Sequence, residues 1–184
     1  MSNRHLARTI AMQTLFVWDF NHRNNSDIDR IIKDNFANFA PDFNDSGYVK
    51  YTIDGIFEHL EEIDNYIRKY ATEWPLEQIT YVDRNILRLG IFELIHAEKI
   101  PPKVAINEAI EIAKAFGSDS SSKFVNGVLG SIFNDLPEEL RKADFIPENE
   151  EEKPAEEIDD ATITKEITEE LKEETKEIDE SPKF

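Results

Sequence analysis

Apolar residues recur at intervals of three and four over most of the first 135 residues, most clearly within residues 101–130. That interval places apolar side chains on one face of an α-helix. Pro101 and Pro102 suit the first turn of such a helix, because a proline ring fixes φ and the missing N–H costs nothing there. The apolar face of this predicted helix consists of Val104, Ile106, Ala109, Ile110, Ala113 and Phe116.

A second helix follows after a turn that is rich in serine. Gly117 stands where a left-handed residue often ends a helix. Residues 118–122 contain four serines and one aspartate, side chains that suit a helix N-cap. The apolar positions of the second helix are Phe124, Val125, Val128, Leu129 and Ile132. We predict that these two helices form a pair against which the rest of the folded region packs.

The same spacing predicts further helices at residues 4–20, 28–36, 48–70 and about 80–95. The last of these is apolar on most sides, which indicates a central position in the core. Ser26 and Asp29 resemble a capping box at the start of the second one. No segment shows the alternation typical of a strand. The predicted fold class is therefore all-α, a compact bundle of about seven helices.

Residues 147–184 differ in composition from the rest of the chain. They carry 16 acidic residues and five lysines, and their only aromatic residue is Phe184. So few apolar groups cannot offset the conformational entropy that folding removes. We therefore predict a folded domain over residues 1–146 and a disordered acidic tail over residues 147–184.

The chain of 184 residues has a formal net charge of −18, which by itself argues against binding to nucleic acid. A net charge of −11 belongs to residues 147–184, however, so residues 1–146 carry only −7. The absence of cysteine excludes disulfides, thiolate catalysis and cysteine-bound metals. No apolar run approaches the roughly 20 residues of a membrane span, and the N-terminus does not resemble a signal peptide. A cytoplasmic location is expected.

One spacing typical of a metal enzyme occurs in the chain. Glu93 and His96 form a Glu-x-x-His pair, as in the carboxylate-bridged di-iron bundles. Those sites need a second such pair, and no other histidine has a glutamate three positions before it. His96 near a helix C-terminus is more simply a favourable partner of the helix dipole. We expect no enzymatic activity, no metal and no cofactor.

Three stretches of the chain resemble the NusB family of bacterial transcription antitermination factors. They are the run KVAINEAIEIAKAFG with the following KFVNGVL, residues 7–16, and residues 82–94, and together they span about residues 4–135. The resemblance implies a NusB-like helical bundle. It also implies a factor that binds boxA-like single-stranded RNA together with NusE, a small-subunit ribosomal protein, in an RNA polymerase-associated antitermination complex.

The resemblance also implies an RNA-binding surface. The arginine-rich N-terminal segment of the family corresponds here to Arg4, His5 and Arg8, although Arg4 and Arg8 at this spacing also suit a solvated helix face. Aromatic positions correspond to Phe16 and Phe124, whose rings either stack on bases or belong to the core. The N–H groups at the start of the helix after the serine turn suit a phosphate. The residues predicted to bind RNA are Arg4, His5, Arg8, Phe16, Ser120, Ser121, Ser122, Lys123 and Phe124.

Asp83 corresponds to an acidic position that contacts NusE in the family, which makes it the predicted partner-binding residue. A capping box with Thr80 is an alternative role, and the two roles are compatible. Arg88 is expected to belong to a structural ion pair. The alternative function is a helical protein-interaction module in which RNA binding is weak or lost, because few cations stand at the N-terminus.

Overall fold

The computed structural model describes residues 3–23, 25–97 and 99–141, and these residues form helices without any strand. The elements are α1 (Asn3–Phe20), η1 (Asn25–Asp27), α2 (Ile28–Phe39), α3 (Tyr48–Glu58), α4 (Leu60–Tyr70), η2 (Leu76–Gln78), α5 (Tyr81–Ile95), α6 (Pro102–Phe116), α7 (Ser121–Asp135) and α8 (Glu138–Arg141). The all-α prediction is confirmed, with eight α-helices in the described part where about seven were expected. The predicted acidic tail lies outside the described residues.

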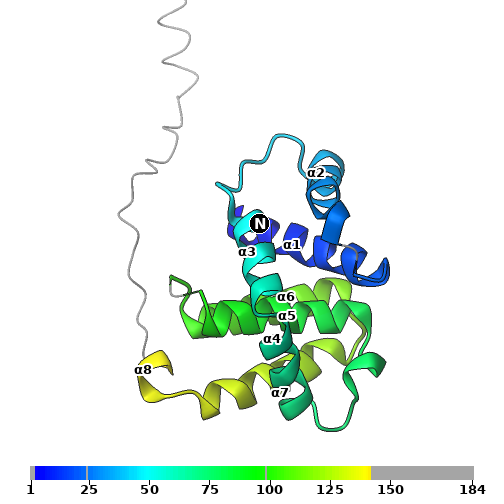
Figure 1. The fold of residues 1–184 in the computed structure, drawn as a ribbon. Helices are drawn as coiled ribbons and strands as arrows, with labels where there is room; N and C mark the ends of the chain where they lie inside the picture. The colour runs from blue at the N-terminus through cyan, green and yellow to red at the C-terminus, as the bar shows by residue number, and fades with distance from the viewer. Residues whose placement is uncertain (1–2, 24, 98, 142–184) are drawn as a thin grey trace, which may run out of the picture. The chain divides into compact units, whose positions relative to one another are not determined.

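The central element is α5, as its apolar composition predicts. Every residue from 83 to 94 in this helix is buried. Helices α1, α3, α4, α6 and α7 all pack against it, and Figure 1 shows α5 and α6 in the middle of the bundle, between α1 and α7. The predicted pair α6 and α7 also pack against each other.

Two glycines allow neighbouring helices to approach α5 closely. A Cβ atom added at Gly55 in α3 would lie 2.3 Å from Cε2 of Phe92. A Cβ atom added at Gly90 in α5 would lie 2.8 Å from Cδ1 of Leu129 in α7. Real Cβ contacts are not this short. A side chain at either position would force the neighbouring Phe92 or Leu129 to move. Gly127, by contrast, has nothing near its Cβ direction.

The helix predicted over residues 48–70 is in fact two helices, α3 and α4, which are joined at His59. The apolar spacing continues across the junction, so it gave no sign of the break. At the junction His59 has φ −108° and ψ 17°, outside the range of a regular α-helix. The bend lets α3 bury Ile56 and α4 bury Ile63 against α5, with both side chains fully inaccessible.

Several predicted helix ends are wrong. Gly117 ends α6 in an extended conformation, with φ −89° and ψ −169°, and not in the left-handed one. Glycine is required there for space, because a Cβ would lie 2.7 Å from the carbonyl oxygen of Ala113. The N-cap of α2 is Asp27 and not the predicted Ser26, and the side chain of Asp27 makes no capping bond. Phe116, expected on the buried face of α6, is 41% exposed.

A buried group of charges joins α1, α4 and α5. Arg88 donates from Nε and Nη2 to the two carboxylate oxygens of Asp64, at 2.7 and 2.9 Å, and from Nη1 to Asp19 at 2.8 Å. Arg84 also donates to Asp19, at 2.8 Å. Burial alone would raise the pKa of Asp19, but the bond from Arg84 and the charge of Arg88 hold that pKa below its ordinary value. Arg88 is therefore a structural ion-pair residue, as predicted.

Among the residues described, none of the helices combines the length with the apolar character that crossing a bilayer requires.

We predict that Arg88→Met lowers the free energy of unfolding by about 3–5 kcal/mol, because buried Asp64 loses its bidentate partner and buried Asp19 loses one of its cations. Urea unfolding followed by circular dichroism measures the change. Arg30→Met is the matched control. Arg30 is 70% exposed and pairs with Asp27 across 3.5 Å, so its loss should cost about 0–1 kcal/mol. Similar losses in the two variants would contradict the structural role of Arg88.

Candidate functional site

The first group of predicted site residues, Arg4, His5 and Arg8, lies at the N-terminus of α1. Its third member, Arg8, faces inward. Arg8 is 2% exposed and donates from Nε to both oxygens of Glu93 in α5, at 2.8 and 3.0 Å. The hydroxyl of Tyr48 also donates to Glu93. Arg8 Nη1 lies 3.4 Å from Oε2 of Glu108 in α6. Arg8 thus ties α1 to two other helices from inside the bundle.

The other two members lie nearer the surface. Arg4 is exposed, and His5 is half-buried. Nδ1 of His5 lies 2.8 Å from the same Glu108 oxygen that faces Arg8. Glu108 therefore holds the first turns of α1 against α6, and Arg4 is left at the outer edge of this group.

The inward position of Arg8 has a signal in the sequence that is visible in retrospect. Ala7 and Ala11, close to Arg8 on the same side of α1, are buried. Glu93 lies in the middle of a helix that is apolar on most sides, and a carboxylate there needs a cationic partner. Burial raises the pKa of Glu93, and the charge of Arg8 acts against that rise.

The second group of predicted site residues, residues 120–124, lies in the turn after α6 and in the first turn of α7. Ser120 is the N-cap residue of α7, but its side chain makes no capping bond. Ser121 is buried, and its Oγ accepts a hydrogen bond from the backbone N–H of Ser118 at 2.8 Å. The hydroxyl of Ser118 lies 3.0 Å from the same oxygen. Ser121 thus holds the turn together from within.

The remaining members of the second group face outward to different degrees. Lys123 is exposed, whereas Ser122 and Phe124 are half-buried. Phe124 packs against the hydrophobic core with part of its ring surface left open, so base stacking stays a prediction for the open part. The outer side of the first turn of α7 therefore presents a cation, a hydroxyl and part of an aromatic ring.

The third group is an aromatic cluster at the C-terminal end of α1. The half-buried ring of Phe16 stacks on Phe20, with centroids 6.0 Å apart, and meets Tyr81 of α5 edge-on at 6.3 Å. Phe20 is 57% exposed and Tyr81 is 40% exposed. The spacing of apolar residues gave no sign that the rings of Phe20 and Tyr81 lie at the surface. We call Phe16, Phe20 and Tyr81 the aromatic patch.

Asp83 lies two residues after Tyr81, in the first turn of α5. Its backbone N–H donates to Oγ1 of Thr80 at 3.1 Å, so the predicted N-cap at Thr80 is confirmed. The side chain of Asp83 is only 8% exposed. Its Oδ1 atom is buried and has no hydrogen-bond partner among the residues that the structure describes. A buried carboxylate oxygen in this state favours an incoming donor.

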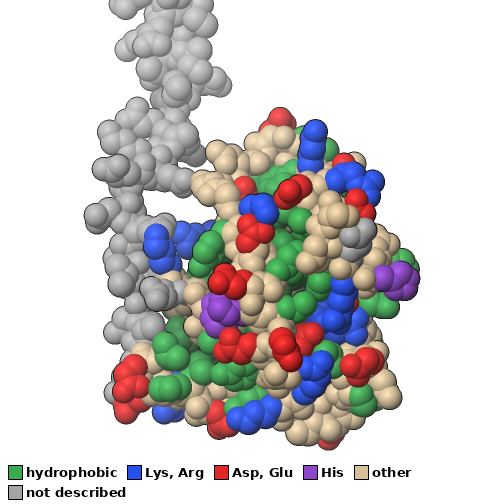
Figure 2. All heavy atoms as spheres, viewed as in Figure 1, with side chains coloured by type: hydrophobic (Ala, Val, Ile, Leu, Met, Phe, Trp, Pro, Cys, Tyr) green, Lys and Arg blue, Asp and Glu red, His purple; other side chains and the backbone are tan. Residues whose placement is uncertain are grey.

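These three groups supply binding chemistry. Cations attract phosphate, the first N–H groups of a helix accept anions, and exposed aromatic faces stack on bases or pack against a protein partner. The first group lies on α1, the second at the start of α7, and the third on α1 and α5. Helices α1 and α7 both pack on α5, and Glu108, which contacts the first group, lies on α6. The groups are therefore distributed over several helices of the bundle. Figure 2 shows acidic and basic side chains interspersed on the face viewed there, without a broad surface of one sign.

Comparison with known proteins identifies close relatives. The model of the NusB family matches residues 5–134. The transcription antitermination protein NusB of Dehalococcoides mccartyi (strain ATCC BAA-2266) is 38% identical over 141 residues, which are 77% of this chain and 96% of that protein.

Solved structures agree with the sequence comparison. A crystal structure of T. maritima NusB matches with a TM-score of 0.67 and 33% identity, over 76% of this chain and 96% of that one. A crystal structure of the antitermination factors NusB and NusE in complex with dsRNA matches with a TM-score of 0.65 and 31% identity, over 74% of this chain and 99% of the matched chain.

We predict that Arg8→Met lowers the free energy of unfolding by about 3–5 kcal/mol, because it leaves Glu93 buried and without its cation. Adding Glu93→Leu to Arg8→Met should recover a large part of the loss, since both charges are then gone. Arg4→Met is the matched control, and its effect should stay within about 0.5 kcal/mol because Arg4 is exposed. Chemical denaturation of the four proteins gives these values. Equal stability of the Arg4 and Arg8 variants would refute the buried pair.

Proposed function

Because this chain belongs to the NusB family, we propose that it is a transcription antitermination factor that binds boxA-like single-stranded RNA together with NusE. In this proposal it acts without catalysis, as a binding component of an RNA polymerase-associated complex. It acts in the cytoplasm, where RNA polymerase and the nascent transcript are found.

The observation that carries the proposal is the match to the chain crystallised with NusE and dsRNA. That match extends over 99% of the matched chain at 31% identity, so the likeness covers a whole binding protein and not a fragment of one. The family model matches residues 5–134, which include all of α5 and α6 and all but the ends of α1 and α7, the described helices that carry the three groups.

For RNA, we propose the outer side of the α7 N-terminus and the outer edge of α1. Lys123 neutralises a phosphate, and Ser122 with the first N–H groups of α7 holds its oxygens. The open part of the Phe124 ring stacks on an unpaired base. Arg4 and His5 contribute from α1, while Arg8, Ser120 and Ser121 shape the surface from behind or beside it. Phe16 offers a second ring for stacking.

For NusE, we propose the surface around Asp83 and the exposed part of the aromatic patch. Exposed tyrosine and phenylalanine rings are enriched in protein interfaces, where their large surfaces are buried. The Oδ1 atom of Asp83, buried without a described partner, accepts a hydrogen bond from a basic group of NusE. Since Phe16 stacks on Phe20, the RNA and NusE surfaces meet at this end of α1.

The burial of Arg8 favours the second candidate, a helical protein-interaction module with weak or lost RNA binding. Because Arg8 is engaged with Glu93 and Glu108, it adds little to the attraction of phosphate at the surface. In this second candidate function, the chain still binds NusE through the same surface, but its binding to RNA is weak at any salt concentration.

We expect boxA-like single-stranded RNA to bind with an affinity that falls steeply with salt and rises when NusE is added. Fluorescence anisotropy with labelled RNA, with and without NusE, measures both effects, and the same RNA as a duplex tests the strand preference. Lys123→Ala should weaken binding and lower the salt slope by about 1. Lys114→Ala is the control, because Lys114 is exposed and pairs with Glu111. If RNA fails to bind at low salt even with NusE present, the second candidate replaces the first.

We predict that Asp83→Asn weakens NusE binding at least tenfold, because the amide removes the negative charge and presents a donor where an acceptor is needed. RNA binding by the free protein should change little. Isothermal titration calorimetry measures the NusE affinity, and Glu77→Gln on the nearby η2 is the control for loss of one exposed acidic charge. An unchanged NusE affinity in a folded Asp83→Asn protein would remove Asp83 from the interface.

A further inference from the structure

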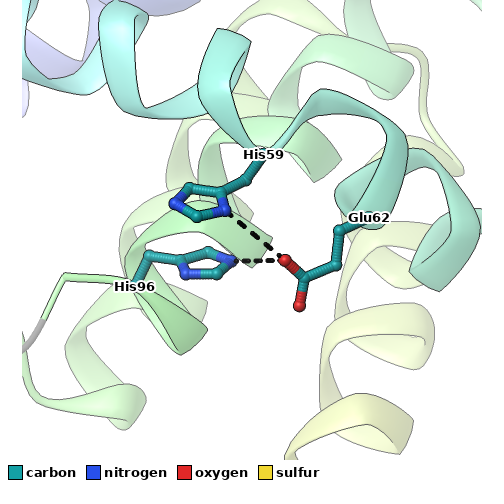
Figure 3. Close-up of side chains that lie close together, drawn as sticks. All are labelled: His59, Glu62 and His96. Atoms are coloured by element: carbon teal, nitrogen blue, oxygen red, sulfur yellow. Dashed lines mark ion pairs between the residues drawn. The ribbon is translucent and has the colours of Figure 1, made fainter.

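Two histidines and a glutamate from the start of α4 and the end of α5 meet at one place in the fold. His59 lies at the junction of α3 and α4, Glu62 in the first turn of α4, and His96 at the C-cap of α5. Oε2 of Glu62 lies 3.5 Å from Nδ1 of His59 and 3.4 Å from Nε2 of His96. Figure 3 shows the two rings one above the other, with these nitrogens directed to the same carboxylate.

We propose that His59, Glu62 and His96 form a zinc site. The three donor atoms lie within 4.8 Å of one another, so one ion can reach them all. Zinc bonds to imidazole nitrogen and carboxylate oxygen are about 2.0–2.2 Å long, and the edge of a tetrahedron with such bonds is about 3.3–3.5 Å. The two nitrogen–oxygen distances to Glu62 already have this length.

The present contacts leave one of the three donor atoms unsatisfied. Nε2 of His96 is buried and makes no hydrogen bond to any residue that the structure describes, although it lies close to Glu62. A cation between them would satisfy both groups. The acidic side chain of Glu58 is near enough to act on His96 and adds negative potential.

Metal binding requires one ring to turn. The two imidazoles are stacked, with centroids 3.8 Å apart and planes at 11°. The lone pair of each donor nitrogen lies in its ring plane, so an ion between two parallel rings would be out of line with both. The side chain of His59 is 34% exposed and lies at a helix junction, which gives its ring room to tilt. Glu62, at 49% exposure, can follow the ion.

The donor set selects the ion by its chemistry. Two imidazoles and one carboxylate suit zinc, whereas magnesium and calcium prefer oxygen ligands alone. Three protein ligands leave a fourth position for water. Because the ligands come from the α3–α4 junction, α4 and α5, a bound ion would link the bend at His59 to the end of the central helix. The site therefore acts as a structural link that stabilises the fold.

Calorimetric titration of the full-length protein with zinc chloride tests the site. We expect one ion per chain, and binding at least tenfold weaker in His59→Asn and His96→Asn. His22→Asn is the matched control: it removes an exposed histidine whose φ of 61° asparagine tolerates. Glu62→Gln should also weaken binding, and Glu61→Gln, its exposed neighbour, should not. The acidic residues 147–184 are present in every variant and contribute the same background.

Two further measurements make the result decisive. Zinc should raise the melting temperature of the wild type and of His22→Asn, but not that of His59→Asn. Cobalt in place of zinc should give the visible absorption of a tetrahedral ion in the same proteins only. Circular dichroism establishes that each variant is folded, and half-exposed His59 is the substitution that the fold tolerates best. No zinc binding by the wild type, or equal binding by the cluster and control variants, would overturn the site.

Discussion

The buried guanidinium of Arg88 constrains the arrangement of the other helices. It lies in the central helix α5 and is fully inaccessible, so its charge must be met by carboxylates that other helices bring inward. Asp19 at the end of α1 and Asp64 in α4 meet that need. Apolar contacts depend less on direction than these hydrogen bonds do. The charge group therefore sets which turn of α1 and which turn of α4 face α5.

The same helix carries contacts of the residues that we propose to bind RNA, NusE and zinc. Further along α5, Glu93 holds Arg8 and so positions the N-terminal turns of α1. At the start of α5, Tyr81 belongs to the aromatic patch and Asp83 follows two residues later, whereas His96 at the other end lies beside Glu62. Because α5 is buried between the other helices, these ends keep a fixed relation to one another. The proposed binding surfaces on different helices are thus positioned by one rigid helix, α5.

The spacing of apolar residues was sufficient to predict the helices and the central position of α5, because each of these depends on local periodicity. It was insufficient for the break at His59, where the apolar interval continues unchanged. The role of Arg8 was hidden for another reason, since a basic residue on a helix reads as exposed until its distant partner Glu93 is known. The cluster of His59, Glu62 and His96 likewise depends on tertiary packing. In the sequence, only the spacing of Glu93 and His96 was typical of a metal site. In the structure, Glu93 pairs with Arg8 and His96 lies beside Glu62.

The contact between Gly55 and Phe92 has a consequence for the evolution of this fold. The phenyl ring occupies the volume that a methyl group at position 55 would need. A larger residue at position 55 would force the ring of Phe92 to move, and a smaller residue at position 92 would remove that conflict. Among related chains, the two positions should covary in size, with their summed volume nearly constant. This pair offers a way to trace how α3 and α5 keep their separation while the sequences around them diverge.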